Sequence, residues 1–551
     1  MLLIFVHFGR KLYLYTFKIE YMQKSWIVLF FLIIAQLVSA ELTLSRMFSS
    51  NMVLQRDETI AIYGTATAGS EVKVVLGGQV QIANIDAKGQ WKVVFRPLKA
   101  SSIPVELTVG SGNELLKLHN ILVGDVWICT GQSNMEWPLK REKHFAEEQN
   151  KLDNKLLRIN NPVPAGRYVY GVSYTDSLIR RLNTRDFYRW EGWQESGMQS
   201  APETSAIAYY FAKEVISATG IPVGIINLSI GGAPLETFIP VKAMQSHPEF
   251  KEKVKAMDWL DNKSLPLWTS ERGRQNIGGF SQRPDPLGST VDGMPVAENN
   301  LQTTAHTTQI PGDERGKNHA YKPGFAYASG IEPLLPLAVK GILLYQGESN
   351  AQEPERVAEF RELQKLMITS YREAWKKPAM PFYWVQLSSI DTLRYKSHYW
   401  PWFRNEQRLL VNELAHTGMA VSSDHGARHD VHPTNKKVVG ERLARLALKE
   451  VYKKKVNAYG PEAVSAEYKK GRVIVRFKQA GRLSTSDNAA LKGFSLDGRN
   501  PAEARIENNT VVLPSPTRPT AVYYGWQPYS EGNLVDEEGM PASTLKIVVN
   551  G

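Results

Sequence analysis

The chemistry that this sequence can support centres on one serine. Gly131-Gln132-Ser133 follows an apolar run, Val126–Cys129, that is typical of a short buried strand. Open α/β sheets place reactive groups at the carboxyl ends of their strands, and a glycine before the serine relieves crowding in a sharp turn. If a helix follows, its N–H groups favour negative charge at Ser133. Ser133 is therefore a candidate nucleophile, although a serine that only caps a helix would explain an isolated G-x-S better.

Three further segments pass from an apolar run into polar residues. The first is Val223–Leu228, followed by a double glycine at 231 and 232. An ordinary tight turn explains that pair, but the pair can also present a backbone N–H with no side chain in the way. The second is Gly341–Tyr345, followed by QGESN, and the third is DHGARHDVHP at 424–433. In the last segment the proline at 433 favours a helix start close behind it.

These segments together resemble the SGNH (GDSL-like) hydrolase superfamily and specifically the sialate O-acetylesterase family. The resemblance is carried by GQSNMEWP, YQGESNA and DVHPTNKKVVGERLA in that order, with FSSNMVLQRD, AKGQW, RNEQRLL and NLVDEEGMPAS around them. It covers most of the mature chain. It implies a serine esterase that removes O-acetyl groups from sialic acids through an acetyl-serine intermediate.

The resemblance implies a role for each residue of the site. Ser133 is the expected nucleophile and His432 its base, because a free serine attacks poorly at neutral pH. The backbone N–H groups of Ser133 and Gly231 and the amide of Asn350 are the expected oxyanion hole. Taken alone, His432 would more simply be structural and Asn350 a turn cap.

The carboxylate that completes the triad stays open. The superfamily places this acid three residues before the histidine, but Asp430 lies only two residues before His432. Asp430 nevertheless fits the family through its DVHP match and ranks first. Glu348 ranks second, because related acetylesterases with a Q-G-E motif use such a residue to orient the histidine, and Asp424 is the third candidate.

Sialic acid carries a carboxylate, which an arginine can bind through paired hydrogen bonds. Arg428, close to His432, is the first candidate for this contact and Arg404 the second. A surface arginine, or one in a helix pair, would look the same in the sequence. Four further residues are expected at the substrate or its acetyl pocket: Gln132, Gln346, Trp137 and Tyr345.

Three alternative functions would use some of the same residues. The histidines at 425, 429 and 432, with Asp430, could bind zinc, but no cysteine joins them, the chain has no H-E-x-x-H pattern, and esterase chemistry needs no metal. We therefore expect no metal and no cofactor. An acetylesterase acting on xylan would share the same motifs. A non-catalytic carbohydrate-binding protein is the third alternative, against which the intact Ser133 and His432 argue.

The composition along the chain predicts how these residues are positioned. A chain of 551 residues is too long for one core. Residues 41–119 alternate in strand fashion with glycine-rich turns, which predicts an N-terminal β-sandwich. Residues 120–452 alternate strands with helices, which predicts a three-layer α/β domain with a parallel sheet. The polar insertion at 245–322 is predicted to be a structureless binding insertion or lid, and residues 453–551 return to a β pattern.

The elements expected in the α/β domain are short strands and longer helices. The expected strands are Gly124–Cys129, Val223–Leu228, Val339–Tyr345, Phe382–Leu387 and Met419–Ser423. The expected helices are Ser205–Thr219, Glu355–Trp375, Arg404–Ala415 and Asn435–Tyr452. In the second helix, apolar residues from Val357 to Trp375 share one face, which predicts that this face is buried.

The first 40 residues have the features of a secretory signal peptide. Lys24 precedes the apolar run Trp26–Val38, small residues close it, and Met22 is the expected true start. The run is too short for a comfortable membrane span, so we expect none after cleavage. Cys129 is the only cysteine, which excludes an internal disulfide. We expect an exported, periplasmic protein whose partner is an acetylated sugar rather than nucleic acid. Its net charge, +11 for the full sequence and +8 without the first 40 residues, is expected to be spread over a solvated surface.

Overall fold

The computed structural model describes residues 41–551, except 69, 166–173, 256–257, 278–289, 292–293, 296–315, 394 and 479–480. The expected signal peptide and the start at Met22 lie outside the described residues. The chain forms two compact units. One contains the described residues up to Ser45 with Ile62–Val93 and Thr108–Lys117, and the other contains Arg46–Ala61, Val94–Leu107 and Leu118–Gly551.

The first unit is built from strands. Buried and exposed side chains alternate along β4 (Glu71–Leu76) and β6 (Gln90–Phe95), as a half-buried strand requires. In β4, for example, Val72 and Val74 point inward and Lys73 outward. The remaining strands that contribute to it are β1 (Thr43–Leu44), β3 (Ile60–Thr65), β5 (Gln79–Asn84) and β7 (Ser101–Ser111).

The second unit is a mixed α/β structure with a large mixed sheet. The strand order is β12-β9-β13-β8-β16-β17-β18, in which only the β12–β9 pair of this series is antiparallel. The central strands are buried on both faces, as expected for parallel strands. The strand bounds are β8 (Glu114–Gly131), β9 (Asn154–Asn160), β12 (Gln194–Ser196), β13 (Val223–Asn227), β16 (Gly341–Tyr345), β17 (Phe382–Val385) and β18 (Thr417–Ala420).

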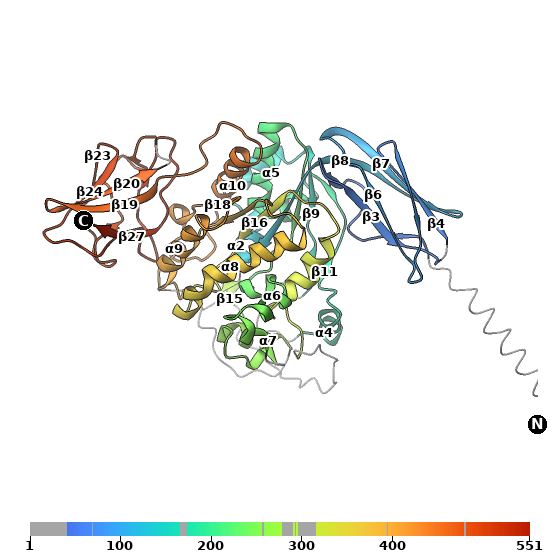
Figure 1. Ribbon diagram of the computed structural model, residues 1–551, viewed down its shortest axis with the longest axis horizontal. Coiled ribbons are helices and arrows are strands. Elements are labelled where there is room, and N and C mark those ends of the chain that lie inside the picture. Colours follow the sequence, from blue (N-terminus) through green and yellow to red (C-terminus); the bar gives the residue numbers. More distant parts are fainter. Residues whose placement is uncertain are drawn as a thin grey trace, which may run out of the picture. The chain divides into compact units, whose positions relative to one another are not determined.

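Helices pack on this sheet. Helices α5 and α10 lie side by side (Figure 1), and α5 also contacts β13 while α10 contacts β17 and β18. The apolar face predicted from Val357 to Trp375 is buried in α8. The helix bounds are α2 (Ser133–Glu136), α3 (Phe145–Glu148), α4 (Asp176–Asn183), α5 (Ala206–Thr219), α6 (Val241–Ser246), α7 (Leu267–Ile277), α8 (Pro354–Ala374), α9 (Trp400–Val411) and α10 (Lys437–Glu450).

The structure corrects three sequence predictions. Helix α9 begins at Trp400 rather than at Arg404, because Pro401 is tolerated in a first turn. Strand β9 was not expected, since its short run NKLLRIN alternates only weakly. The insertion at 245–322 is not structureless, because Leu267–Ile277 form helix α7, while much of its remainder lies outside the described residues.

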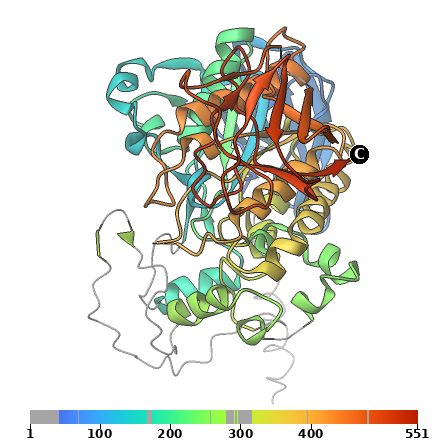
Figure 2. The same cartoon turned by 90° about the vertical axis from the view of Figure 1, so that its left-hand side faces the viewer.

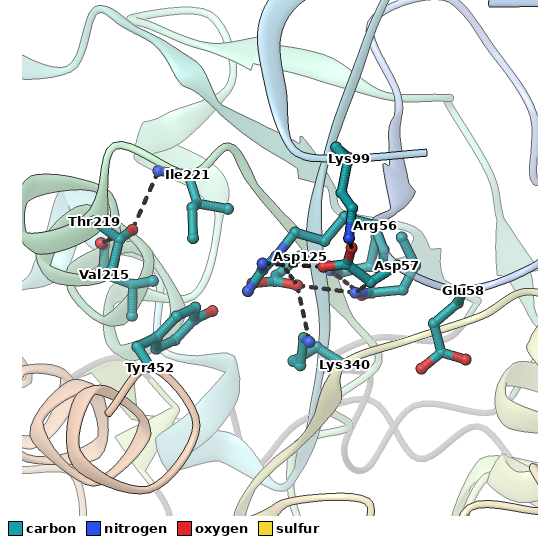
Figure 3. A network of polar contacts seen from close by, with 12 residues as sticks. Arg56, Asp57, Glu58, Lys99, Asp125, Val215, Thr219, Ile221, Lys340 and Tyr452 are labelled. Carbon is teal, nitrogen blue, oxygen red and sulfur yellow. Dashed lines mark hydrogen bonds and ion pairs between the residues drawn. The ribbon is translucent and has the colours of Figure 1, made fainter. Parts of the chain in front are cut away.

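A buried carboxylate anchors β8 at the point where its parallel pairing with β13 begins. Asp125 is fully buried and accepts hydrogen bonds from Gln55 at 2.8 Å and from Nε of Arg56 at 3.0 Å. The ammonium of Lys340, one residue before β16, lies 3.2 Å from the same oxygen of Asp125. Figure 3 shows these cations around Asp125, with the hydroxyl of Tyr452 pointing toward it. The cluster ties the segment before β3 and the start of β16 to β8.

The last part of the chain forms a seven-stranded sheet around its own apolar core. Its members are β22 (Phe494–Ser495), β25 (Ala521–Tyr524), β27 (Leu545–Asn550), β19 (Glu462–Lys469), β20 (Arg472–Lys478), β24 (Thr510–Pro514) and β23 (Arg505–Glu507). Figure 2 shows these orange and red strands gathered together. The core they enclose includes Val475, Leu513 and Val522. No helix among the described residues is long and apolar enough to span a membrane.

Candidate active site

The structure brings Ser133 and His432 together from segments 299 residues apart. Ser133 is the first residue of α2, directly after β8, and His432 lies in the loop between β18 and α10. The hydroxyl Oγ of Ser133 is 2.8 Å from Nε2 of His432, which is hydrogen-bond distance. Both residues are only partly buried. A neutral imidazole in this position can accept the hydroxyl proton of the serine.

Gly131 makes the sharp turn before Ser133 sterically allowed. Its φ of +125° is a conformation that side chains rarely adopt, and a Cβ on it would lie 2.1 Å from the carbonyl oxygen of Tyr345. The backbone N–H of Gln132 donates to that same oxygen at 3.0 Å. The end of β8 therefore sits directly against the end of β16, which brings the QGESN loop to the serine.

The imidazole of His432 packs on an indole. The rings of Trp137 and His432 are stacked, with centroids 5.5 Å apart and planes at 25°. Trp137 directly follows α2, whose first residue is Ser133. The same short segment therefore supplies both the serine and the ring that packs on His432. Trp137 is thus at the site, as expected. Tyr345 is fully buried, and its hydroxyl lies 3.4 Å from Oγ of Ser422.

Of the three candidate acids, Asp430 lies nearest to the imidazole. Its Oδ1 is 3.6 Å from Nδ1 of His432, longer than a normal hydrogen bond, and accepts the backbone N–H of His432 at 2.8 Å. The two-residue spacing causes this geometry, because it closes an Asx turn. The carboxylate of Asp424 is held by both terminal nitrogens of Arg442, at 2.7 and 2.6 Å.

Glu348, the remaining candidate, is fully buried and bonds to a neighbour of the serine instead. Its Oε1 accepts a hydrogen bond from Nδ2 of Asn134 at 2.5 Å. Burial raises the pKa of Glu348 to about 7, against the opposing influence of Asn134 and of the Lys436 ammonium. Glu348 therefore reaches the His432 loop through Asn134.

The expected oxyanion donors lie on loops that are braced against each other. The side chain of Asn350 is clamped at both ends: Oδ1 accepts the N–H of Leu235 and Nδ2 donates to Glu236, each at 3.0 Å. Glu236 is itself buried beside the guanidinium of Arg356. The carbonyl of Gly231 accepts a hydrogen bond from the Tyr321 hydroxyl at 2.8 Å. The amide of Asn350 is thus fixed before any substrate arrives.

Gln132 and Gln346 hold these loops together. Nε2 of Gln346 donates to Oε1 of Gln132 at 3.2 Å and to the carbonyl of Ala233 at 2.8 Å. The N–H of Ser349 also donates to Gln132. Both glutamine side chains are buried. Their contacts give them a bracing role, while the substrate contact expected for them stays a prediction.

Comparison with known proteins shows which esterases this chain is similar to. Residues 314–449 match the family model described as carbohydrate esterase, sialic acid-specific acetylesterase. The chain is 23% identical to the sialate O-acetylesterase of Mus musculus, over 80% of each chain, and 23% identical to that of Homo sapiens, over 80% of this chain and 77% of the other. It resembles the crystal structure of a carbohydrate acetylesterase from Xanthomonas citri with a TM-score of 0.70 and 26% identity, over 92% of this chain and 99% of that one.

These matches support the resemblance of the chain to the sialate O-acetylesterase family. The chain is a carboxylic ester hydrolase, as the sequence motifs predicted. An acetylated sugar as substrate fits this class of enzyme. The order GQSNM, QGESN, DVHP, on which the resemblance rested, corresponds in the structure to the loops after β8, β16 and β18.

The two arginines considered for substrate binding have different surroundings. Arg404 is fully buried and donates to the carbonyl oxygens of Gly525 and Gln527 at 2.9 and 2.5 Å, so it holds the C-terminal sheet against α9. It does not suit the role that we considered for it. Arg428 is half-exposed, pairs with Glu531 at 2.9 Å and lies over the ring of Tyr529. Arg428 remains the candidate for an anionic substrate.

The histidines of the 424–433 segment face separate partners. His425 lies 3.4 Å from Asp424, and His429 lies 2.9 Å from Asp391, whereas His432 faces Ser133. In the part of the chain that the structure describes, no three His, Cys, Asp or Glu side chains gather closely enough to hold a metal ion.

Sequence reasoning missed two buried residues of the site, Asn134 and Lys436. Asn134 directly follows the nucleophile, and Lys436 follows His432 by four residues, so both lie within the motifs. The Nζ atom of Lys436 donates to Oδ1 of Asn134. Burial lowers the pKa of Lys436 to about 7. Position within the motifs was the only signal for them, since neither residue type predicts burial.

Proposed function

We propose that this enzyme removes O-acetyl groups from sialic acids through an acetyl-Ser133 intermediate. The observation that carries the proposal is the 2.8 Å contact between Oγ of Ser133 and Nε2 of His432. Similarity to sialate O-acetylesterases supports the substrate class. The sheet that presents Ser133 supports a three-layer SGNH arrangement, with a β-sandwich at 41–119, a catalytic domain at 120–452 and a β region at 453–551 as its proposed divisions.

The reaction would run in two stages. His432 accepts the proton of Ser133 while Oγ attacks the acetyl carbonyl, and the resulting imidazolium gives that proton to the departing sugar oxygen. Water, deprotonated by the same imidazole, then attacks the acetyl-serine and releases acetate. Each stage passes through a tetrahedral oxyanion.

The oxyanion would be held by the N–H groups of Ser133 and Gly231 and by the amide of Asn350. The nitrogen Nδ2 of Asn350 carries two hydrogens, and Glu236 takes one of them. Because Leu235 and Glu236 fix this amide, it need not reorganise when charge develops, which is the source of oxyanion-hole catalysis. Loss of such a donor typically slows the reaction on the order of 10²–10³-fold.

Asp430 would stabilise the imidazolium. The oxygen 3.6 Å from Nδ1 needs only a small movement to reach hydrogen-bond distance, and catalytic hydrogen bonds often tighten once substrate is bound. Arg428 would bind the carboxylate of the sialic acid. Its exposure permits this, and exchange of Glu531 for the substrate would keep the charge paired. Export to the periplasm, directed by the first 40 residues, completes the proposal.

The test is acetate release from O-acetylated sialic acid and from acetylated xylan, measured in parallel with the mature protein and with Ser133→Ala. Release from the sialic acid, abolished in the variant, is the expected result. Preference for xylan would keep the mechanism but overturn the substrate. No acetate release from either substrate or from an aryl acetate would instead favour a carbohydrate-binding protein.

A further inference from the structure

The side chain of Asn134 joins the nucleophile segment to the segment of the base. Nδ2 donates to Oε1 of Glu348 at 2.5 Å and to the carbonyl oxygen of Val431 at 3.0 Å. Oδ1 accepts a hydrogen bond from Lys436. The partners distinguish the two ends of the amide, since only the nitrogen can donate and only the oxygen can accept. The amide therefore has one orientation.

The hydrogen bond from Asn134 to Val431 matters because of where the two residues lie in the chain. Asn134 is the residue after Ser133, and Val431 is the residue before His432. The hydrogen bond between them thus links the backbones of the two reacting residues. A shift of the Val431 carbonyl would move the imidazole away from Oγ, and misplacement by about 1 Å can cost about 10²-fold in rate.

Lys436 supports the same arrangement from a second side. Its Nζ lies 5.6 Å from the ring centroid of Trp137 and 5.7 Å from that of Tyr345, while Trp137 stacks on His432. An ammonium at this distance is attracted to an aromatic face. Lys436 therefore contacts both the amide behind Ser133 and the ring behind His432.

The charges of this cluster are expensive to bury. Glu348, Asn134 and Lys436 are all buried, and Oε2 of Glu348 is a buried oxygen that has no hydrogen-bond partner among the described residues. The acidic groups that face Lys436 are Glu348, Asp430 and Glu142, and burial outweighs them in lowering its pKa. Apolar residues of similar volume would stabilise such a core at least as well. The presence of these buried charges is therefore better explained by their holding the site residues in position than by a gain in stability.

We propose that Asn134, held by Glu348 and Lys436, is a positioning residue that fixes the Val431–His432 segment against Ser133. This inference rests on the proposed roles of Ser133 and His432. It assigns Glu348 to the orientation of Asn134, and not to direct contact with the imidazole. Because the cluster acts on the reacting groups and not on the sugar, its loss lowers kcat and leaves KM nearly unchanged.

The test is an exchange of donor and acceptor between positions 134 and 348, measured with the mature protein and an aryl acetate. Asn134→Asp places a second carboxylate against Glu348 and removes the donor to Val431. We expect kcat to fall about 100-fold. In Glu348→Gln the amide oxygen can still accept from Asn134, although more weakly than a carboxylate, so kcat should fall much less than in Asn134→Asp, by about threefold.

The double variant Asn134→Asp/Glu348→Gln restores one donor, because the new amide can donate to the new carboxylate. We expect it to recover about tenfold of the kcat lost in Asn134→Asp, with KM close to wild type in all three variants. A Glu348→Gln variant about 10⁴-fold slower, with no recovery in the double variant, would overturn the proposal and make Glu348 the triad acid. Equal activity in Asn134→Asp and wild type would also overturn it.

A matched pair of lysine variants separates positioning from folding. Lys436→Met should lower kcat at least about tenfold without lowering the unfolding temperature, since it removes a buried charge. Lys437→Met changes the neighbouring lysine, which is 40% exposed and pairs with Glu441, and should leave both unchanged. A Lys436→Met variant that loses activity only in proportion to its unfolded fraction would contradict the positioning role. Retained activity in Ser133→Ala would instead overturn the proposed function itself.

Discussion

Strand β8 runs between two buried carboxylate clusters, one at each edge of its parallel pairing with β13 and β16, and the two clusters differ in how many hydrogen bonds their carboxylates accept. Where the pairing with β13 begins, Asp125 accepts from Gln55 and Arg56 and is approached by Lys340. Beyond its end, Glu348 receives one hydrogen bond, from Asn134, and its second oxygen has no hydrogen-bond partner among the described residues.

This difference separates anchoring from chemistry. A buried carboxylate that accepts several hydrogen bonds holds its donors in place. These bonds replace the hydrogen bonds to water that the carboxylate lost on burial. A buried carboxylate with few donors has its pKa raised, as burial does for Glu348, and such groups concentrate at functional sites. The same pair of strands, β8 and β16, thus supports structure at one edge and reactivity at the other.

The largest expected effect is at the reactive end. Ser133→Ala should lower kcat/KM for an aryl acetate by at least about 10⁴-fold, because the nucleophile is lost. Ser133 is only partly buried and a methyl group fits in place of CH₂OH, so the unfolding temperature should not fall. Steady-state kinetics and thermal unfolding on the same preparation check both statements. A Ser133→Ala variant that unfolds would contradict the view that this residue serves catalysis and not stability.

For Asp125, the expected effect of substitution is on stability alone. Asp125→Ala leaves the partly buried Arg56 guanidinium and Lys340 ammonium without this fully buried partner and should lower the free energy of unfolding by about 3–5 kcal/mol in urea titration. The control is Asp57→Ala, which removes an exposed partner of the same Arg56 and should cost less than about 1 kcal/mol. Loss of kcat in the folded fraction of Asp125→Ala would contradict the division of roles.

The third prediction concerns the fixed amide at the oxyanion site. Asn350→Ala should lower kcat on the order of 10²–10³-fold while KM changes little, because the donor acts only when charge develops. The pair Leu235–Glu236 loses its clamp in this variant, so thermal unfolding is recorded as well. A decrease of less than about threefold would exclude Asn350 from the oxyanion hole.

The smallest effect is expected from His319, a buried group in the insertion. Its Nδ1 accepts the N–H of Tyr321, whose hydroxyl donates to Gly231. Burial lowers the pKa of His319 to about 3, whereas the unfolded chain has the ordinary value of 6.5. Between these values the unfolded state binds the extra proton, so the free energy of unfolding falls as the pH falls from 6.5 toward 3.

Substitution of that histidine tests the sign of this dependence. His319→Gln should unfold with a shallower decrease in stability between pH 7 and pH 4.5 than wild type, by at most about one bound proton. Urea titrations at the two pH values measure the difference. An identical dependence of the free energy of unfolding on pH in the two proteins would show that His319 protonates as readily in the folded state as in the unfolded chain.

Local motifs made much of the site predictable from the sequence. Ser133 and His432 lie in contiguous runs whose residue types suit acyl transfer, and the strands before them are uniformly apolar. The bond from Lys436 to Asn134 spans 302 residues, and no local pattern encodes it. Arg404 shows the opposite error, because a guanidinium that binds buried carbonyls cannot be told in sequence from one that binds a ligand.

The choice of the triad acid depends on side-chain geometry of a few tenths of an ångström. Asp430 and Glu348 are both carboxylates within the motifs, and only the coordinates show that one closes an Asx turn while the other bonds to Asn134. For Glu348 the missing information is a contact with a residue 214 positions away in the chain. Helix α9 begins at Trp400, four residues before the predicted start at Arg404.

The central claim is that Ser133 carries the acetyl group during the reaction. Rapid acid quenching of the enzyme during turnover of an aryl acetate, followed by mass spectrometry of its peptides, tests it directly. The account predicts one acetyl group on the peptide that contains Ser133, absent from Ser133→Ala. Acetylation of another residue, or full turnover by Ser133→Ala with no acetyl-enzyme, would contradict it.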